Sequence, residues 1–266
     1  MDHRGFLRRL IESELARPLF LIVAVFVLWQ LVIDVFHIPP YLIPAPLAVA
    51  KMLVAEWPRL WRESLVTAYA TLGGFGLSIV LGIPIAMAIA YSRMVESFVY
   101  PLMVFSQSVP KIAIAPLFVV WFGFGILPKV ISAFLLGFFP VVVATVMGFK
   151  SIETEMIDLA RSMRATRLQM FVKFSLPHAL PSIFSGLKVS ATLAVVGAVV
   201  GEFVGSNSGI GYVLQIANGN FDLPLMFAAL FVLSMMGVLL FAAVELAEKL
   251  MIPWHQSRRG ELAATA

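Results

Sequence analysis

Cysteine is absent from the 266-residue chain, and charged residues make up only 13% of it. Without cysteine the chain has no disulfide framework, no thiolate metal site and no cysteine nucleophile. Soluble domains carry about 25% charged residues, so this low charge, with 61% hydrophobic residues and a mean hydropathy of +0.96, indicates a membrane protein. The basic residues are scattered over short loops and not gathered on one face, which argues against nucleic-acid binding.

Motifs for nucleotide binding and hydrolysis are also missing. No Gly-x-x-x-x-Gly-Lys-Ser/Thr phosphate loop occurs, so ATP-driven work would need a partner chain. The histidines, His3, His37, His178 and His255, show no metal-binding spacing. Residues 205–209 only superficially look like a nucleophile motif, because no base is paired with them. We therefore expect this chain not to be an enzyme and to hold no cofactor or metal.

Six apolar runs are long enough to cross a bilayer as helices. They cover residues 19–36, 65–91, 99–122, 127–149, 182–204 and 223–246. The first run ends without a small-residue cleavage site, so we interpret it as an uncleaved span and not as a signal peptide. The sequence thus predicts an all-α polytopic membrane protein with six transmembrane helices. We divide it into residues 1–63 (amino-terminal tail, first span and connector), 64–248 (transmembrane domain) and 249–266 (tail).

Lysine and arginine predict how these spans are oriented. With a cytoplasmic amino terminus, only Lys51, Arg59, Arg62 and Lys129 fall outside, and Lys111 and Lys188 fall within spans. The basic residues that fall inside are Arg4, Arg8, Arg9, Arg17, Arg93, Lys150, Arg161, Arg164, Arg167, Lys173, Lys249, Arg258 and Arg259. This is the bias that the positive-inside rule describes. Both termini and the loop at residues 150–178 are therefore expected in the cytoplasm.

Charged and helix-breaking residues inside the runs are candidates for a translocation path. Pro110, Lys111 and Pro116 interrupt the third run, and carbonyls freed by proline must be satisfied by protein or water. A charge within a span is costly and marks a functional candidate. Lys111 could meet an anionic substrate group, or it could only pack or snorkel, as Lys188 could. Glu202, near the outer end of the fifth run, could belong to an outer gate or a subunit interface, or it could be a simple interfacial carboxylate.

The longest polar interruption between apolar runs covers residues 158–181. Apolar residues recur there every three to four positions and charged residues fill the other face, which predicts two short amphipathic helices. Pro177 and Pro181 mark the return to apolar sequence. Asp158 is expected near a helix start, where its carboxylate would cap exposed amides. Leu159 and Met163 would then offer an apolar edge.

The spacing in this loop resembles the EAA loop of ABC-importer permeases. Asp158-Leu159-Ala160, then Arg164, then Phe174-Ser175-Leu176-Pro177 follow the family order of Glu-Ala-Ala, Gly and Ile-x-Leu-Pro. Two residues depart from that pattern, since Leu159 stands in place of Ala and Arg164 in place of Gly. Glycine permits a left-handed turn, and an arginine there costs roughly 1 kcal/mol or rebuilds the turn. The segment from Pro110 to Pro116 also resembles the family's Pro-x-x-Ala-x-x-Pro pattern.

The resemblance covers about residues 64–248 and is greatest to the nitrate, sulfonate, taurine and pyrimidine-precursor branch. It implies a permease subunit of a binding-protein-dependent ABC importer with the type I fold, in the bacterial inner membrane. It also implies ABC ATPase subunits that bind ATP and Mg, an extracytoplasmic solute-binding protein that delivers a small organic or anionic solute, and a second, identical permease copy. The ATPase-docking residues that it implies are Asp158, Leu159, Ala160, Arg161, Met163, Arg164, Phe174, Leu176 and Pro177.

Two other classes of protein fit the sequence less well. A secondary transporter working without an ATPase would be expected to show inverted repeats and an intramembrane carboxylate relay, and the sequence shows neither clearly. A membrane-embedded hydrolase would need the nucleophile or metal constellation that the chain lacks.

Overall fold

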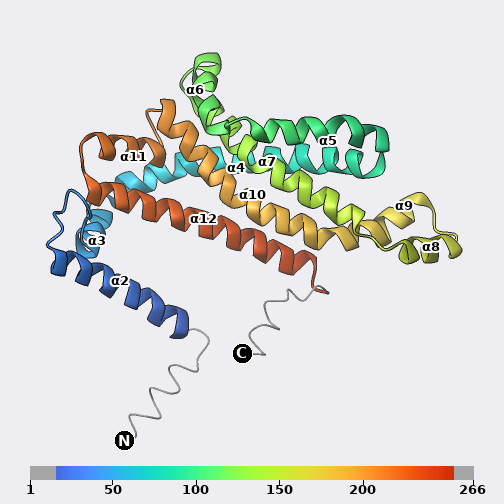
Figure 1. Ribbon diagram of the computed structural model, residues 1–266, viewed down its shortest axis with the longest axis horizontal. Helices are drawn as coiled ribbons and strands as arrows, with labels where there is room; N and C mark the ends of the chain where they lie inside the picture. Colours follow the sequence, from blue (N-terminus) through green and yellow to red (C-terminus); the bar gives the residue numbers. More distant parts are fainter. Residues whose placement is uncertain (1–15, 255–266) are drawn as a thin grey trace, which may run out of the picture. The chain divides into compact units, whose positions relative to one another are not determined.

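The computed structural model describes residues 16–254. The tail arginines expected in the cytoplasm, Arg4, Arg8, Arg9, Arg258 and Arg259, lie outside the described residues. Over the described range all regular elements are helices (Figure 1). They are α2 (Ala16–Phe36), α3 (Pro46–Ala55), α4 (Trp57–Tyr91), α5 (Arg93–Ser108), α6 (Lys111–Phe122), α7 (Ile126–Lys150), α8 (Thr154–Ser162), α9 (Arg167–Met170), the π-helix η1 (Phe171–Ser175), α10 (Leu176–Gly205), α11 (Ile210–Gly219) and α12 (Leu223–Met251).

Four of these helices are long and apolar enough to cross a membrane, and the bent pair α5 and α6 can be counted as a fifth span. Two of the four extend a predicted run at its beginning, since α4 begins at Trp57 and the helix that ends at Gly205 begins at Arg167. In α2 the stretch Phe20–Phe36 is a shorter apolar helix, so the first of the six spans stays a prediction. The all-α polytopic membrane fold is confirmed.

The chain divides into two compact units, and the larger one comprises Arg62–Tyr212 and the residues from Val232 onward. Its hydrophobic core is built from small and branched residues of α4, α7, α10 and α12, including Ala70, Val141, Ala191 and Val244. The smaller unit comprises the residues up to Trp61 together with Val213–Phe231, where Trp29 and Phe227 make a ring contact at 5.7 Å. The division predicted at residues 63 and 248 stays a prediction.

Glycine allows α7 and α10 to approach closely within the larger unit. A Cβ added at Gly197 of α10 would lie 2.5 Å from the Ser132 carbonyl oxygen and 2.6 Å from the Ala133 Cα on α7. Neither atom can move without moving the α7 backbone. Small residues at helix interfaces are the usual means of close packing in membranes, where lipid supplies little hydrophobic drive between helices. The two helices therefore pack tightly, and this packing holds the site residues that they carry at a fixed separation.

The loop at residues 158–181 differs from the prediction of two separate short helices. The first is present as α8, but the second, α9, continues through η1 into α10 without a break. Pro177 lies in the first turn of α10, where its missing N–H is tolerated, and Pro181 lies inside the helix. The prolines therefore do not separate the loop from the span.

Candidate functional site

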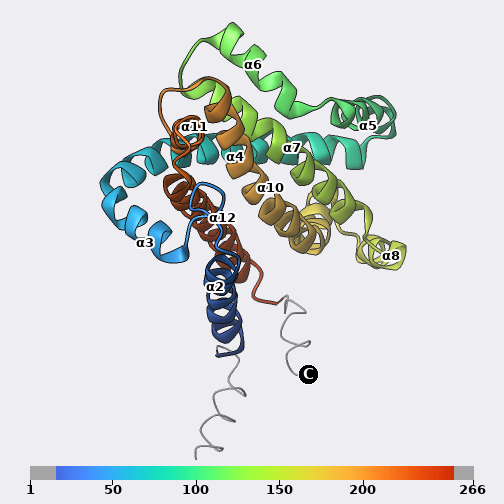
Figure 2. The ribbon, with the colours of Figure 1, turned by 60° about the vertical axis from the view of Figure 1, so that its left-hand side comes forward.

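The amphipathic helix α8 lies beyond the end of α7, in both views of the ribbon (Figures 1 and 2). Leu159 and Met163 expose 58% and 68% of their surface on it, whereas Ala160 is fully buried. The predicted apolar edge is thus present and open. The position predicted for Asp158 is wrong, because α8 begins at Thr154 and Asp158 lies in mid-helix, where its carboxylate pairs with Arg161 at 3.2 Å. The prediction placed the helix start too late, so Asp158 caps no amides.

Arg164 terminates α8 in a left-handed turn, with φ of +54°. The Arg164 N–H donates to the Arg161 carbonyl over 2.9 Å, and the Ala165 N–H donates to the Ala160 carbonyl over 3.1 Å. These two hydrogen bonds make a Schellman motif, whose left-handed position is usually occupied by glycine. The arginine therefore keeps the left-handed turn instead of rebuilding it, and carries its steric penalty.

The second half of the loop is continuous with the span, and its side chains differ in exposure. Thr166 and Gln169 form a capping box that starts α9. Phe174 lies in η1, and Leu176 and Pro177 lie at the start of α10. All three are half-buried, and their docking role stays a prediction. Leu168 and Val172, which the sequence analysis did not single out, expose 72% and 50% of their surface. The four-residue spacing of Leu168 and Val172 could be recognised in the sequence. Which face of the helix is exposed could not, because it depends on how α9 packs.

The predicted break in the third run is present as a 93° bend between α5 and α6. Pro110 is the N-cap of α6 and Lys111 its first residue, whereas Pro116 remains inside the helix. The Lys111 ammonium lies 5.9 Å from the centre of the Phe139 ring. Lys111 also lines a cavity of about 190 Å³ with Met103, Ser106, Val109, Ile114, Leu135, Phe138 and Phe139.

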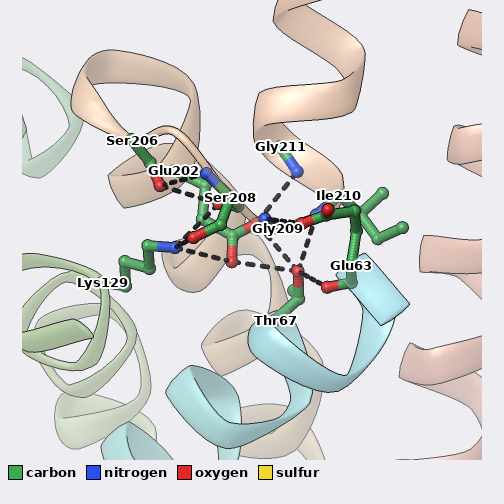
Figure 3. A network of polar contacts seen from close by, with 9 residues as sticks. All are labelled: Glu63, Thr67, Lys129, Glu202, Ser206, Ser208, Gly209, Ile210 and Gly211. Atoms are coloured by element: carbon green, nitrogen blue, oxygen red, sulfur yellow. Dashed lines mark hydrogen bonds and ion pairs between the residues drawn. The ribbon is translucent and has the colours of Figure 1, made fainter. Parts of the chain in front are cut away.

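Glu202 is the centre of a buried polar cluster near the end of α10 (Figure 3). The Lys129 ammonium on α7 lies 3.8 Å from its carboxylate, and the two side chains are only 3% and 0% exposed. The Thr67 hydroxyl on α4 is directed at the same carboxylate, with oxygen–oxygen distances of 3.0 and 2.9 Å. One carboxylate thus ties three long helices of the larger unit together.

Backbone groups of the turn between α10 and α11 close this cluster. The Lys129 ammonium donates to the Ser208 carbonyl over 2.8 Å. N–H groups of the turn and of the first residues of α11 donate to side chains of the cluster: Gly209 to Glu63 (2.7 Å), Ile210 to Thr67 (2.9 Å) and Gly211 to Glu202 (2.9 Å). Gly209 has φ of +100°, and a Cβ there would lie 2.1 Å from Glu202 Oε1. Since α11 begins at Ile210, the carboxylate also lies where the helix dipole favours negative charge.

Lys129, Thr67 and Glu63 were missed by the sequence analysis, which counted Lys129 only as an outside charge. The available signal was the opposite charge of Lys129 and Glu202, both at the outer ends of predicted spans. Glu202 and Lys111 belong to different sites, because Lys129 and Phe139 are separated by ten positions along α7, a rise of roughly 15 Å. Lys188, the other lysine within a predicted span, forms an ion pair with Glu248.

Apolar spanning helices, a bent span and an amphipathic loop define the class as a polytopic membrane protein. The family described as binding-protein-dependent transport system inner membrane component matches residues 78–253. The chain belongs to this family of ABC-importer permeases, which is a transport component and not an enzyme, and is a multi-pass inner-membrane protein. Family membership sets aside the secondary transporter and the hydrolase.

Curated relatives cover nearly the whole chain. The formylaminopyrimidine transport permease protein ThiX of Halalkalibacterium halodurans is 38% identical over 91% of this chain and 96% of its own length. The riboflavin transport system permease protein RibX of Chloroflexus aurantiacus is 36% identical, covering 87% of each chain. An inward-facing structure of the MetNI methionine ABC transporter is 20% identical, with a TM-score of 0.61 over 70% of this chain and 92% of that chain, which supports the fold alone.

Proposed function

We propose that this permease imports a small organic or anionic solute as one of two identical copies, driven by ABC ATPase subunits that dock on α8 and the start of α9. The observation that carries the proposal is the exposed apolar edge of α8, with Leu159 and Met163 open to solvent on a helix closed by its own Schellman turn. An apolar edge on a charged helix is the form that docks into a groove of a partner. ATP and Mg would be bound by the ATPase.

The proposed substrate class rests on the relatives. Two relatives with more than a third of residues identical are named for the transport of formylaminopyrimidine and of riboflavin. The taurine transport system permease protein TauC of Escherichia coli is 27% identical over 85% of this chain. We infer that an extracytoplasmic binding protein selects the solute and delivers it to the outward ends of the spans. The excess of basic residues on the other side supports cytoplasmic termini.

In the proposed mechanism, movement of the ATPase is transmitted to the spans through the continuous helical stretch of α9, η1 and α10. A push on the start of α9 would reach α10 directly, because α9, η1 and α10 follow one another without a break. Phe171 of η1 also stacks on Phe149 of α7 at 6.0 Å, so α7 would move with α10. Glu202 lies near the far end of that helix, at the turn that its cluster holds. The α9 half of the loop and the turn after α10 are thus joined by one continuous helical stretch.

The experiment compares ATPase co-purification and solute uptake in membranes with matched permease levels. Burying each apolar side chain contributes about 1.5–3 kcal/mol, so the Leu159→Asp, Met163→Asp double variant should lose co-purified ATPase by tenfold or more. Glu155→Ala is the matched control, since it changes an exposed residue of α8 and leaves the apolar edge intact. Wild-type co-purification and uptake in the double variant would show that α8 is not the docking element.

A further inference from the structure

Lys111, Lys129 and Lys188 lie on the apolar helices α6, α7 and α10, and two of them are paired with carboxylates. Lys129 lies 3.8 Å from Glu202, and Lys188 pairs with Glu248. Lys111 differs, because among the described residues its ammonium meets only the ring of Phe139, at 5.9 Å. A cation in the apolar part of a span normally has a negative partner, since an uncompensated charge there is costly. Among the described residues, Lys111 therefore lacks the negatively charged partner that is expected for a cation at this position.

The cavity beside Lys111 has room for such a partner. Its volume is about 190 Å³, and its other lining residues are apolar except for Ser106. The Ser106 hydroxyl donates to the Met103 carbonyl over 2.7 Å, which leaves its oxygen lone pairs free to accept but gives the cavity no negative charge. Pockets for drug-sized ligands are about 300–1,000 Å³, so this one fits a small solute or one end of a larger solute.

We propose that the Lys111 cavity at the α5–α6 bend is a binding subsite for the anionic group of a small organic solute. The ammonium would pair with a carboxylate or sulfonate, and the solute's apolar body would lie against Phe138, Phe139 and Ile114. The apolar walls limit access of water, which strengthens the ion pair. The chemistry selects an organic monoanion over a cation, and over a polyphosphate, which one lysine cannot neutralise.

This inference rests on the proposed function for its supply of solute, but not on where the ATPase docks. A lipid phosphate could offer the same negative charge to Lys111, because lysines near helix ends reach towards headgroups. The experiment therefore varies the soluble anion and the lipid separately.

The test uses single cysteines in the cysteine-free chain, with the permease and its ATPase together in phosphatidylcholine nanodiscs. Ser106→Cys places a thiol in the cavity. This thiol is reacted with an anionic (sulfonatoethyl) and a cationic (trimethylammonioethyl) methanethiosulfonate. The two reaction rates are compared on the permease band after electrophoresis. Charge focusing in a low-dielectric cleft raises local counter-ion concentration about tenfold or more. We expect the anionic-to-cationic rate ratio to fall about tenfold when Lys111→Gln is added.

Two controls separate the cavity from general charge effects. Ser97→Cys lies on the exposed side of α5 outside the cavity, and its rate ratio should not respond to Lys111→Gln. Lys51→Gln removes an exposed lysine elsewhere and should leave the Ser106→Cys ratio unchanged. Benzenesulfonate should slow labelling of Ser106→Cys when Lys111 is present and not in Lys111→Gln, while uncharged methyl phenyl sulfone should not slow it in either.

An unchanged rate ratio in Lys111→Gln, or equal protection by the charged and uncharged probes, would overturn the subsite. Protection that follows added phosphatidylglycerol and not benzenesulfonate would assign the cavity to a lipid headgroup and also overturn it. ATPase co-purification is scored on the same preparations, so failure of the docking proposal is recognised separately from failure of this one.

Discussion

At the residue scale, the buried pair of Glu202 and Lys129 holds the turn between α10 and α11. Glu202→Ala should destabilise the permease by about 3–5 kcal/mol, because Lys129 would remain buried without a counter-charge. The measurement is the Tm of the purified permease in detergent, by fluorescence-detected size exclusion. Asp158→Ala is the matched control, since its pair with Arg161 is 69% exposed on both sides and contributes about 0–1 kcal/mol.

The double variant Lys129→Met, Glu202→Leu tests the reason for that loss. It removes both charges, so it should recover much of the stability lost in Glu202→Ala. A double variant as unstable as Glu202→Ala would mean that the hydrogen bonds from Thr67 and Gly211, and not the ion pair, dominate the cluster.

Arg164 is a second residue with a testable role, and the effect of substituting it depends on its backbone conformation. Arg164→Gly should raise stability slightly, by roughly 1 kcal/mol or less, because glycine adopts the φ of +54° without steric penalty. ATPase co-purification should be retained, since the Schellman hydrogen bonds use only backbone groups. The same Tm measurement checks this variant, and a clear loss of Tm or of bound ATPase would show that the guanidinium makes a needed contact.

At the element scale, the close approach of α7 and α10 sets which substitutions the spans tolerate. Gly197→Ala should lower the Tm, because its Cβ would lie 2.5 Å from the Ser132 carbonyl and overpacking costs about 1–3 kcal/mol. Gly76→Ala on α4 should leave the Tm unchanged or raise it, since no atom lies within 4 Å of the added Cβ and alanine favours helix by up to about 1 kcal/mol. Equal shifts in both variants would contradict the packing.

At the scale of the whole molecule, the orientation of the chain is testable with one exposed residue on each side of the continuous helix formed by α9, η1 and α10. A cysteine at Ser162, just before the turn that leads into α9, should react with a membrane-impermeant maleimide only after the cells are opened. A cysteine at Asn207, just after α10, should react in intact cells. Because the chain has no native cysteine, each signal comes from a single site. Labelling of the Ser162 variant in intact cells would reverse the predicted topology.

Composition and pattern by themselves determined the membrane class, most of the spans, the break at Pro110 and the amphipathic loop. Each is a local property: apolar length, a missing N–H, or a period near that of a helix. The helix starts were less well predicted, as Asp158 shows, because α8 begins at Thr154 without a side-chain cap to mark its start.

Tertiary structure alone decided which charged residues meet. Lys129 and Glu202 lie far apart in the sequence, and each looked like a lone charge at the end of a span. They pair because Gly197 and other small residues bring α7 and α10 close, and because Gly209 lets the following turn fold back over the carboxylate. The same packing leaves Lys111 beside a cavity without a carboxylate from the described chain. Local pattern cannot specify such pairings, since they depend on the distance between backbones that only the packed helices set.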